Sequence, residues 1–248
     1  MSKTDTSIGT WLSLYSEAIA EVLVNAGYEW VTIDLEHSAI TIDQAEKLIR
    51  VIDLAGAKPY VRVSSNDEVQ IKRVLDAGAK GIIVPMVESK EDVLAAINAT
   101  NYPPKGRRGM GLARAQGYGE AEAKNDYIHN ISNQIELYIQ IESEAALHHL
   151  DDMFSQDIDG YIIGPYDLSA SMGIPGDFSN QAFIKAEESI LETARKYDIK
   201  RGYHIVEPDL EQLELRKSQG YNFIAFSVDF RMLDVMARTP FNLSLIHI

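Results

Sequence analysis

Apolar residues gather along the chain in eight short runs, which are nearly continuous rather than alternating and are separated by helix-like segments. Continuous runs of Val, Ile, Tyr and Phe are typical of parallel strands that are covered on both faces. Strands that alternate with helices to a count of eight favour a closed (β/α)8 barrel, the TIM barrel, over an open sheet. The predicted strands span residues 7–11, 30–35, 59–63, 81–87, 136–141, 160–163, 202–206 and 222–228.

The segments between the runs carry the start and stop signals of helices. Thr41 and Gln44 form the pattern of a capping box ahead of a helix at 45–54, and Asp67 precedes a second helix at 69–76. An Ala-Gly pair follows each of these two helices, as is usual at a helix C-terminus. These signals support the alternation of strands and helices that a barrel requires.

No linker rich in proline, glycine or serine divides the chain, so one domain is predicted for residues 1–242. The last residues, LSLIHI at 243–248, match the translation of a common sequencing-library transposon end, and we interpret them as a non-native tail. An ordinary apolar C-terminus is the alternative.

Residues 101–133 interrupt the alternation of strands and helices with the glycine- and arginine-rich run PPKGRRGMGLARAQGYG. We expect this long loop to leave the C-terminal end of the fourth strand, where barrels hold their active sites.

Composition narrows the class of protein. The 248 residues carry a net charge of −14 at pH 7 and contain no cysteine. A disulfide scaffold, a cysteine nucleophile and a thiolate metal site are thereby excluded, and nucleic acid or an anionic membrane surface is disfavoured as the main partner. The polar start MSKTDTSIG lacks the apolar stretch of a signal peptide, and no apolar run approaches the ~20 residues that cross a bilayer. We expect a cytoplasmic protein with a small-molecule substrate.

Polar residues follow the predicted strands at their C-terminal ends, where barrel enzymes place their catalytic groups. Glu142 and Asp167 come after consecutive strands, which lie ~4.8 Å apart in a sheet, so their carboxylates can hold one hard divalent cation. The alternative is that Asp167 caps the turn ahead of Ser169 while Glu142 pairs with an arginine. The spacing leaves both interpretations open. Further polar residues on this rim are Glu36, Gln140, His204, Glu207, Ser227 and Asp229.

Two other rim features suggest acid–base or anion chemistry. Asp34 and His37 follow the second strand and can form a carboxylate–imidazole pair, in which the acid fixes the tautomer and raises the basicity of the ring. A histidine in that place is also often a solvated loop residue or a helix cap. Arg62 lies within an apolar strand, where an unpaired charge is costly, so we expect an anionic partner. That partner is either a protein carboxylate or the substrate.

Several catalytic patterns are missing from the sequence. A Schiff-base aldolase needs a lysine near the C-terminal end of a strand, whereas Lys58, Lys80 and Lys200 precede strands and Lys105 lies in the long loop. The turns after strands seven and eight lack the glycines of a phosphate-binding barrel. No GxSxG, P-loop or dinucleotide fingerprint is present. Imine and nucleotide chemistry are thereby disfavoured.

Runs distributed over most of the chain carry a resemblance to a known family. They are IGTW, YEWVTIDLEH, VRVSSNDEVQIKRVLDAGAKGIIVPMV, NYPPKGRRGMG, IQIES, GPYDLSASMG and FSVD, in order and with compatible spacing between residues 7 and 238. The sequence resembles the HpcH/HpaI family of class II pyruvate aldolases. The resemblance implies a TIM barrel of the phosphoenolpyruvate/pyruvate type. It also implies a lyase that uses Mg²⁺, Mn²⁺ or Co²⁺ to cleave a 4-hydroxy-2-oxo acid reversibly to pyruvate and an aldehyde.

The same resemblance implies roles for individual residues. Glu142 and Asp167 match the ligands of the divalent metal, and Arg62 matches the arginine that contacts the keto oxygen of pyruvate. His37, with Asp34, matches the dyad that acts on the C4 hydroxyl of the substrate. The remaining pocket residues that the resemblance implies are Gln140, which lines the pocket, and Gly164, Pro165 and Tyr166, a turn whose backbone meets the pyruvate carboxylate.

Two parts of the chain depart from the family pattern. The run GMGLARAQGYG leaves the aldehyde half of the substrate open, and Arg107, Arg108, Arg114 and Tyr118 are candidates to contact that half. The family's C-terminal helix packs on a neighbouring subunit in trimer-based hexamers, which implies a homo-oligomer, whereas this chain turns into LSLIHI. The alternative functions are a CoA-ester lyase of the citrate lyase β-subunit type and a metal-binding barrel without turnover.

Overall fold

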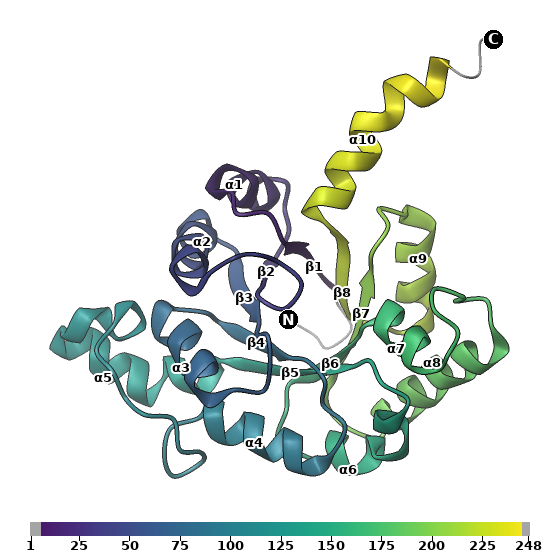
Figure 1. Ribbon diagram of the computed structural model, residues 1–248. Helices are drawn as coiled ribbons and strands as arrows, with labels where there is room; N and C mark the ends of the chain where they lie inside the picture. The colour runs from purple at the N-terminus through teal and green to yellow at the C-terminus, as the bar shows by residue number, and fades with distance from the viewer. Residues whose placement is uncertain (1–5, 245–248) are drawn as a thin grey trace.

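Eight parallel strands close into a barrel in the computed structural model, which describes residues 6–244 (Figure 1). Each strand pairs with its neighbours in the sequence, and β8 pairs with β1 to close the sheet. The predicted TIM barrel is therefore confirmed, and all eight predicted strands are present with small shifts at their ends. The strands are β1 (Ser7–Leu12), β2 (Trp30–Asp34), β3 (Lys58–Arg62), β4 (Gly81–Val84), β5 (Glu136–Ile141), β6 (Gly160–Ile163), β7 (Lys200–Ile205) and β8 (Phe223–Val228).

Helices follow the strands and form the outer layer of the barrel (Figure 1). The two helices predicted from their caps are confirmed: α2 (Ile42–Ala55) has a capping box between Thr41 and Gln44, and α3 (Glu68–Ala77) begins after Asp67. A glycine in the left-handed conformation ends each of them, as the sequence indicated. The other helices are α1 (Glu17–Asn25), α4 (Lys90–Thr100), α5 (Ala121–His129), α6 (Leu150–Phe154), α7 (Pro165–Ser171), α8 (Gln181–Ala194), α9 (Leu210–Gln219) and α10 (Asp229–Ser244).

Aromatic side chains fill the N-terminal half of the barrel interior. Trp30, Tyr60, Tyr138 and Phe223 come from four different strands and are almost fully buried. Phe223 stacks on both Trp30 and Tyr138, with 4.1 Å between ring centroids in each pair. Gly9 leaves room for them, since a Cβ at this position would lie 2.0 Å from the indole of Trp30. This layer of rings lies between the N-terminal end of the barrel and its C-terminal mouth.

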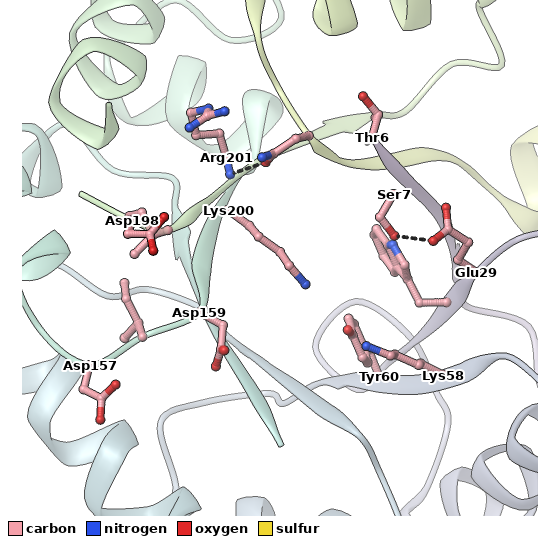
Figure 2. A pocket seen from close by; sticks show the side chains of 14 residues that line it. Thr6, Ser7, Glu29, Lys58, Tyr60, Asp157, Asp159, Asp198, Lys200 and Arg201 are labelled. Atoms are coloured by element: carbon pink, nitrogen blue, oxygen red, sulfur yellow. Dashed lines mark hydrogen bonds between the residues drawn. The ribbon is translucent and has the colours of Figure 1, made fainter. Parts of the chain in front are cut away.

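A cavity of about 680 Å³ opens at the N-terminal end, opposite to the predicted site (Figure 2). Lys58 and Lys200 reach into it from β3 and β7, and both form ion pairs with the carboxylate of Glu136. Although burial raises the pKa of Glu136, hydrogen bonds from Lys200, Lys58 and Tyr138 lower it to about 2. The two lysines, both partly exposed, therefore neutralise Glu136 at the end of the barrel away from the mouth.

The arginine-rich segment does not lie where the sequence predicted it. Helix α4 follows β4 and carries the chain back, so the segment leaves from the N-terminal side of the barrel. It packs outside α2 and α3, where Arg114 pairs with Asp53 and the fully buried guanidinium of Arg108 pairs with Asp76 at 2.7 Å. The expectation that Arg108 and Arg114 contact the aldehyde half is therefore wrong, because both charges are already neutralised by the outer helices.

Helix α10 extends away from the barrel (Figure 1). Its side chains Leu233, Met236 and Phe241 are 59%, 69% and 72% exposed, so the helix presents apolar surface to its surroundings. In the described part of the chain, no helix is both long enough and apolar enough to cross a membrane. The tail predicted at 243–248 stays a prediction, because α10 continues to Ser244 and residues 245–248 lie outside the described residues.

Candidate active site

The C-terminal ends of β2, β3, β5 and β6 bring together polar residues that the sequence singled out. Asp34 and Arg62 end two paired strands and lie opposite each other in the register. Gln140 comes from β5, Glu142 follows that strand, and Asp167 lies in the first turn of α7, directly after β6. The structure therefore places the predicted arginine, amide and carboxylates on one rim of the barrel.

The guanidinium of Arg62 is the charged centre of this rim. Its Nε donates to Oδ1 of Asp34 at 2.9 Å and its Nη2 donates to Oδ2 at 2.8 Å, a bidentate pair between two buried side chains. Its Nη1 lies 2.9 Å from Oε2 of Glu36 and donates to Oε1 of Gln140 at 3.4 Å. Burial opposes the charge, but Asp34 and Glu36 raise the pKa of Arg62 above its ordinary value. Of the two partners expected for Arg62, the structure shows the protein carboxylate.

The imidazole of His37 is not paired with Asp34, in contrast to the predicted dyad. Both oxygens of Asp34 bind Arg62, and Oδ1 also accepts the backbone N–H of His37 at 3.2 Å. The His37 side chain is 60% exposed, and its Nε2 lies 3.8 Å from Oε2 of Glu36. Asp34 and His37 lie in one turn, as the sequence indicates. Arg62, from the neighbouring strand β3, instead takes both carboxylate oxygens of Asp34.

The carboxylate of Glu142 is held by two donors. Oε1 accepts the backbone N–H of Met86 at 2.6 Å, and Oε2 accepts the side-chain amide of Gln140. Met86 has a φ of 55°, a left-handed conformation that is uncommon outside glycine. Met86 lies in the predicted fourth strand at 81–87, and its contact with Glu142 could not be predicted, because a left-handed residue other than glycine has no clear sequence signature.

Gly164 is the point where β6 gives way to α7, beside Glu142 in the sheet. A Cβ at Gly164 would lie 2.7 Å from Nε2 of Gln140 and 3.2 Å from Oε2 of Glu142, so glycine is needed for this close approach. Pro165 is buried in the first turn of α7, and Tyr166 is exposed at the mouth. The predicted turn therefore lies against the predicted amide and carboxylate.

Carboxylates that repel one another make this rim a candidate cation site. Burial raises the pKa of Glu142 to about 7, and the negative charges of Glu36 and Asp167 add to the rise. Within the described residues, no three His, Cys, Asp or Glu side chains converge as a ligand set. A cation held by Glu142 and Asp167 would therefore keep most of its coordination positions for water and small molecules. Oxygen donors with open positions fit a hard divalent cation such as Mg²⁺.

The other side of the mouth carries Trp11, His204 and Ser227, from β1, β7 and β8. The ring centroids of His204 and Trp11 lie 5.0 Å apart, and Nε2 of His204 lies 3.3 Å from the carbonyl oxygen of Ser227. Burial, with the positive charge of Arg62, lowers the pKa of His204 to about 3. The Arg62 guanidinium also lies 4.5 Å from the centroid of the Trp11 ring, which joins the two sides of the mouth. The sequence places His204 and Ser227 on the rim without indicating a role for them, and no sequence signal distinguishes Trp11.

Known proteins are similar to this chain over most of its length. The model of the family HpcH/HpaI aldolase/citrate lyase matches residues 7–234. A 2-keto-3-deoxy-L-rhamnonate aldolase from Klebsiella pneumoniae subsp. pneumoniae is 37% identical over 228 residues, which are 91% of this chain and 84% of that protein. A solved HpcH/HpaI aldolase/citrate lyase family protein from Burkholderia cenocepacia J2315 superimposes with a TM-score of 0.90 at 28% identity, over 97% of this chain and 95% of that one. An HpcH/HpaI aldolase from Desulfitobacterium hafniense DCB-2 gives a TM-score of 0.91 at 26% identity, over 98% and 93% of the two chains.

Replacing Glu142 by glutamine is expected to stabilise the metal-free protein at alkaline pH. The pKa of Glu142 is about 7 in the folded protein against an ordinary 4.5, so the folded state binds the proton more tightly. The free energy of unfolding therefore falls as pH rises from about 4.5 to about 7, because the folded state must then bury the ionised carboxylate of Glu142. Glu142→Gln removes the charge and keeps the shape, so it should gain on the order of 1–3 kcal/mol at about pH 8 and little at about pH 5.

Urea unfolding in the presence of a chelator, at about pH 5 and about pH 8, measures the free energy of unfolding of the parent and of Glu142→Gln. Glu188→Gln, on the exposed face of α8, is the matched control and should shift neither. Equal or lower stability of Glu142→Gln at the higher pH would show that the Glu142 carboxylate is not destabilised by burial.

Proposed function

The chain belongs to the HpcH/HpaI aldolase/citrate lyase family, and from this premise we propose that its substrate is a 4-hydroxy-2-oxo acid of the 2-keto-3-deoxy sugar acid type. As a member, the chain is an aldolase, a carbon–carbon lyase. Cleavage between C3 and C4 of such an acid gives pyruvate and an aldehyde. The observation that carries the proposal is the convergence of Arg62, Glu142 and Asp167 on one rim, in a family of metal-dependent aldolases.

Glu142 and Asp167 are the residues that we propose to hold the divalent cation, with Mg²⁺, Mn²⁺ and Co²⁺ as candidates. A bound divalent cation supplies a Lewis acid, which polarises the 2-oxo group and stabilises negative charge on that oxygen. The raised pKa of Glu142 supports this assignment, because a carboxylate short of counter-charge gains most from a cation. Gln140 donates to Glu142 and keeps its carboxylate oriented.

Arg62 is proposed to contact the keto oxygen of the substrate and to stabilise the enolate that C–C cleavage leaves there. Its bidentate pair with Asp34 fixes the plane of the guanidinium, so little reorganisation is needed when charge develops. The backbone of the turn at Gly164, Pro165 and Tyr166 is proposed to meet the carboxylate of pyruvate. The close packing of Gly164 on Gln140 and Glu142 supports this, because it brings the main chain next to Glu142, which is proposed to hold the cation.

His37 is proposed to remove the proton of the C4 hydroxyl, which becomes the aldehyde oxygen. Its ring is exposed at the mouth, with Nε2 3.8 Å from Oε2 of Glu36. Asp34 holds the backbone of His37 rather than its ring, so its proposed part is to shape the turn and to orient Arg62.

The arginine-rich segment favours a small substrate over a CoA ester. A CoA ester would need cationic side chains for its phosphates. Arg108 and Arg114 pair instead with Asp76 and Asp53 outside the barrel. We therefore propose the aldolase reaction over that of a CoA-ester lyase.

Removal of the divalent cation should abolish pyruvate release. Glu142→Ala and Asp167→Ala should each reduce cleavage to background, because they remove the two proposed protein ligands, whereas Glu188→Ala on α8 should not. The assay follows pyruvate from a panel of 2-keto-3-deoxy sugar acids, with chelator and then with added Mg²⁺, Mn²⁺ or Co²⁺. Full activity in excess chelator, or inactivation by borohydride in the presence of pyruvate, would overturn the metal-dependent mechanism in favour of an imine.

His37 and Arg62 should separate in partial reactions, because they act on different bonds. His37→Ala should lose aldol cleavage by about 10²–10⁴-fold, the usual contribution of a general base. It should retain much of any metal-assisted decarboxylation of oxaloacetate, which has no C4 hydroxyl proton to remove. Arg62→Ala should damage both reactions, and Arg62→Lys should rescue little, since a point charge does not replace the guanidinium fork.

Rates of both reactions, measured on variants that keep the thermal midpoint of the parent, decide between these roles. If His37→Ala lost both reactions equally while Arg62→Ala spared decarboxylation, the two assignments would be wrong.

We propose further that the protein is a homo-oligomer, a trimer-based hexamer, in which α10 packs on a neighbouring copy. The exposed apolar side chains of Leu233 and Met236 support this. Lysine at both positions should lower the mass measured by sedimentation velocity, because burying two ammonium groups in an apolar contact is costly. Leu54→Lys, on the exposed face of α2, is the control and should leave the mass unchanged. An unchanged mass for the double variant, or a monomeric parent, would contradict the proposed contact.

A further inference from the structure

The two sides of the barrel mouth differ in chemistry. The side formed by β2, β3, β5 and β6 carries Arg62, Glu142 and Asp167, which the proposed function assigns to the cation and to the pyruvate half. The side formed by β7, β8 and β1 carries His204 and Trp11. The aldehyde half of the substrate is uncharged in a 2-keto-3-deoxy sugar acid and carries hydroxyl groups. It begins at C4 and extends away from the groups proposed to hold C1 and C2.

His204 offers a hydrogen-bond acceptor on this second side. Its Nε2 lies 3.3 Å from the carbonyl oxygen of Ser227, and since a carbonyl only accepts, Nε2 carries the proton. Nδ1 is then the unprotonated nitrogen, and it has no hydrogen-bond partner within the part of the chain that the structure describes. Burial lowers the pKa of His204 to about 3, so the ring is neutral at neutral pH and Nδ1 is a hydrogen-bond acceptor.

Trp11 offers a hydrogen-bond donor beside it. Its indole Nε1 is buried and has no hydrogen-bond partner among the described residues. The ring lies 5.0 Å from His204 between centroids, and the guanidinium of Arg62 lies on the same indole at 4.5 Å. The rings of Trp11 and His204 are therefore neighbours, next to the residue proposed to contact the keto oxygen.

A neighbouring donor and acceptor complement a hydroxyl group, which both accepts and donates. We propose that Trp11 and His204 bind the hydroxyl on the carbon next to the aldehyde carbon, so that this enzyme selects 2-hydroxyaldehydes over unsubstituted aldehydes. The inference rests on the proposed function, which supplies the reaction, and it adds the residues that choose the aldehyde. A polar pair left unmatched by an unsubstituted aldehyde is the usual source of such discrimination.

Condensation of pyruvate with glycolaldehyde and with acetaldehyde, in the presence of the activating cation, tests the inference. The quantity compared is the ratio of kcat/KM for the two aldehydes, because damage to the cation or pyruvate site affects both reactions and cancels. The parent enzyme should prefer glycolaldehyde. His204→Leu should lower the ratio by about tenfold, the contribution expected of one hydrogen bond in such a site. Trp11→Phe keeps an aromatic ring without the N–H and should lower the ratio several-fold.

Two further variants complete the experiment. His204→Gln retains an acceptor on a planar side chain and should keep most of the preference, which also guards against poor folding of His204→Leu. His148→Leu, on the exposed surface, is the matched control and should leave the ratio unchanged. A ratio in His204→Leu and Trp11→Phe within twofold of an active parent, or a parent without preference for glycolaldehyde, would overturn the assignment of this pair alone. A parent that condenses pyruvate with neither aldehyde would overturn the proposed function itself, and this inference with it.

Discussion

The mouth of the barrel holds more negative charge than Arg62 neutralises. Asp34 takes the guanidinium in a bidentate pair, and Glu36 lies 2.9 Å from the same group. Arg62 has less effect on Glu142 than burial does, so this carboxylate has a pKa of about 7. Keeping an ionised carboxylate out of water without a counter-charge is costly, and Arg62 does not supply enough positive charge to offset that cost at Glu142. The C-terminal rim of the barrel therefore favours the binding of a cation from solution.

The shortage of positive charge connects stability with the proposed chemistry. A neutral side chain at position 142 would favour stability, whereas the proposed cation would bind the deprotonated carboxylate of Glu142. The fold supports the strained arrangement from several directions. Met86 adopts a left-handed backbone to donate to Glu142, and Gly164 lacks a side chain so that Gln140 can reach the same carboxylate. The other side of the mouth carries Trp11 and His204, which we propose to select the aldehyde.

Local and periodic features of the chain could be predicted from the sequence, and contacts between distant segments could not. Continuous apolar runs, capping residues and glycine caps gave the strands, α2 and α3, because each depends on neighbouring residues. The position of Glu142 and Asp167 on one rim followed from the topology. The partner of Asp34 did not, because Arg62 competes from another strand. Residues 101–133 were assigned to the wrong end, since α4 was not recognised as the connection that reverses the chain.

Diffraction from crystals grown with Mn²⁺ and pyruvate, with data collected to record the anomalous signal of manganese, locates the cation. We expect one strong peak next to the carboxylates of Glu142 and Asp167, with pyruvate beside it and Arg62 at the keto oxygen. Manganese absent from that rim, with pyruvate bound elsewhere or linked to a lysine, would contradict it.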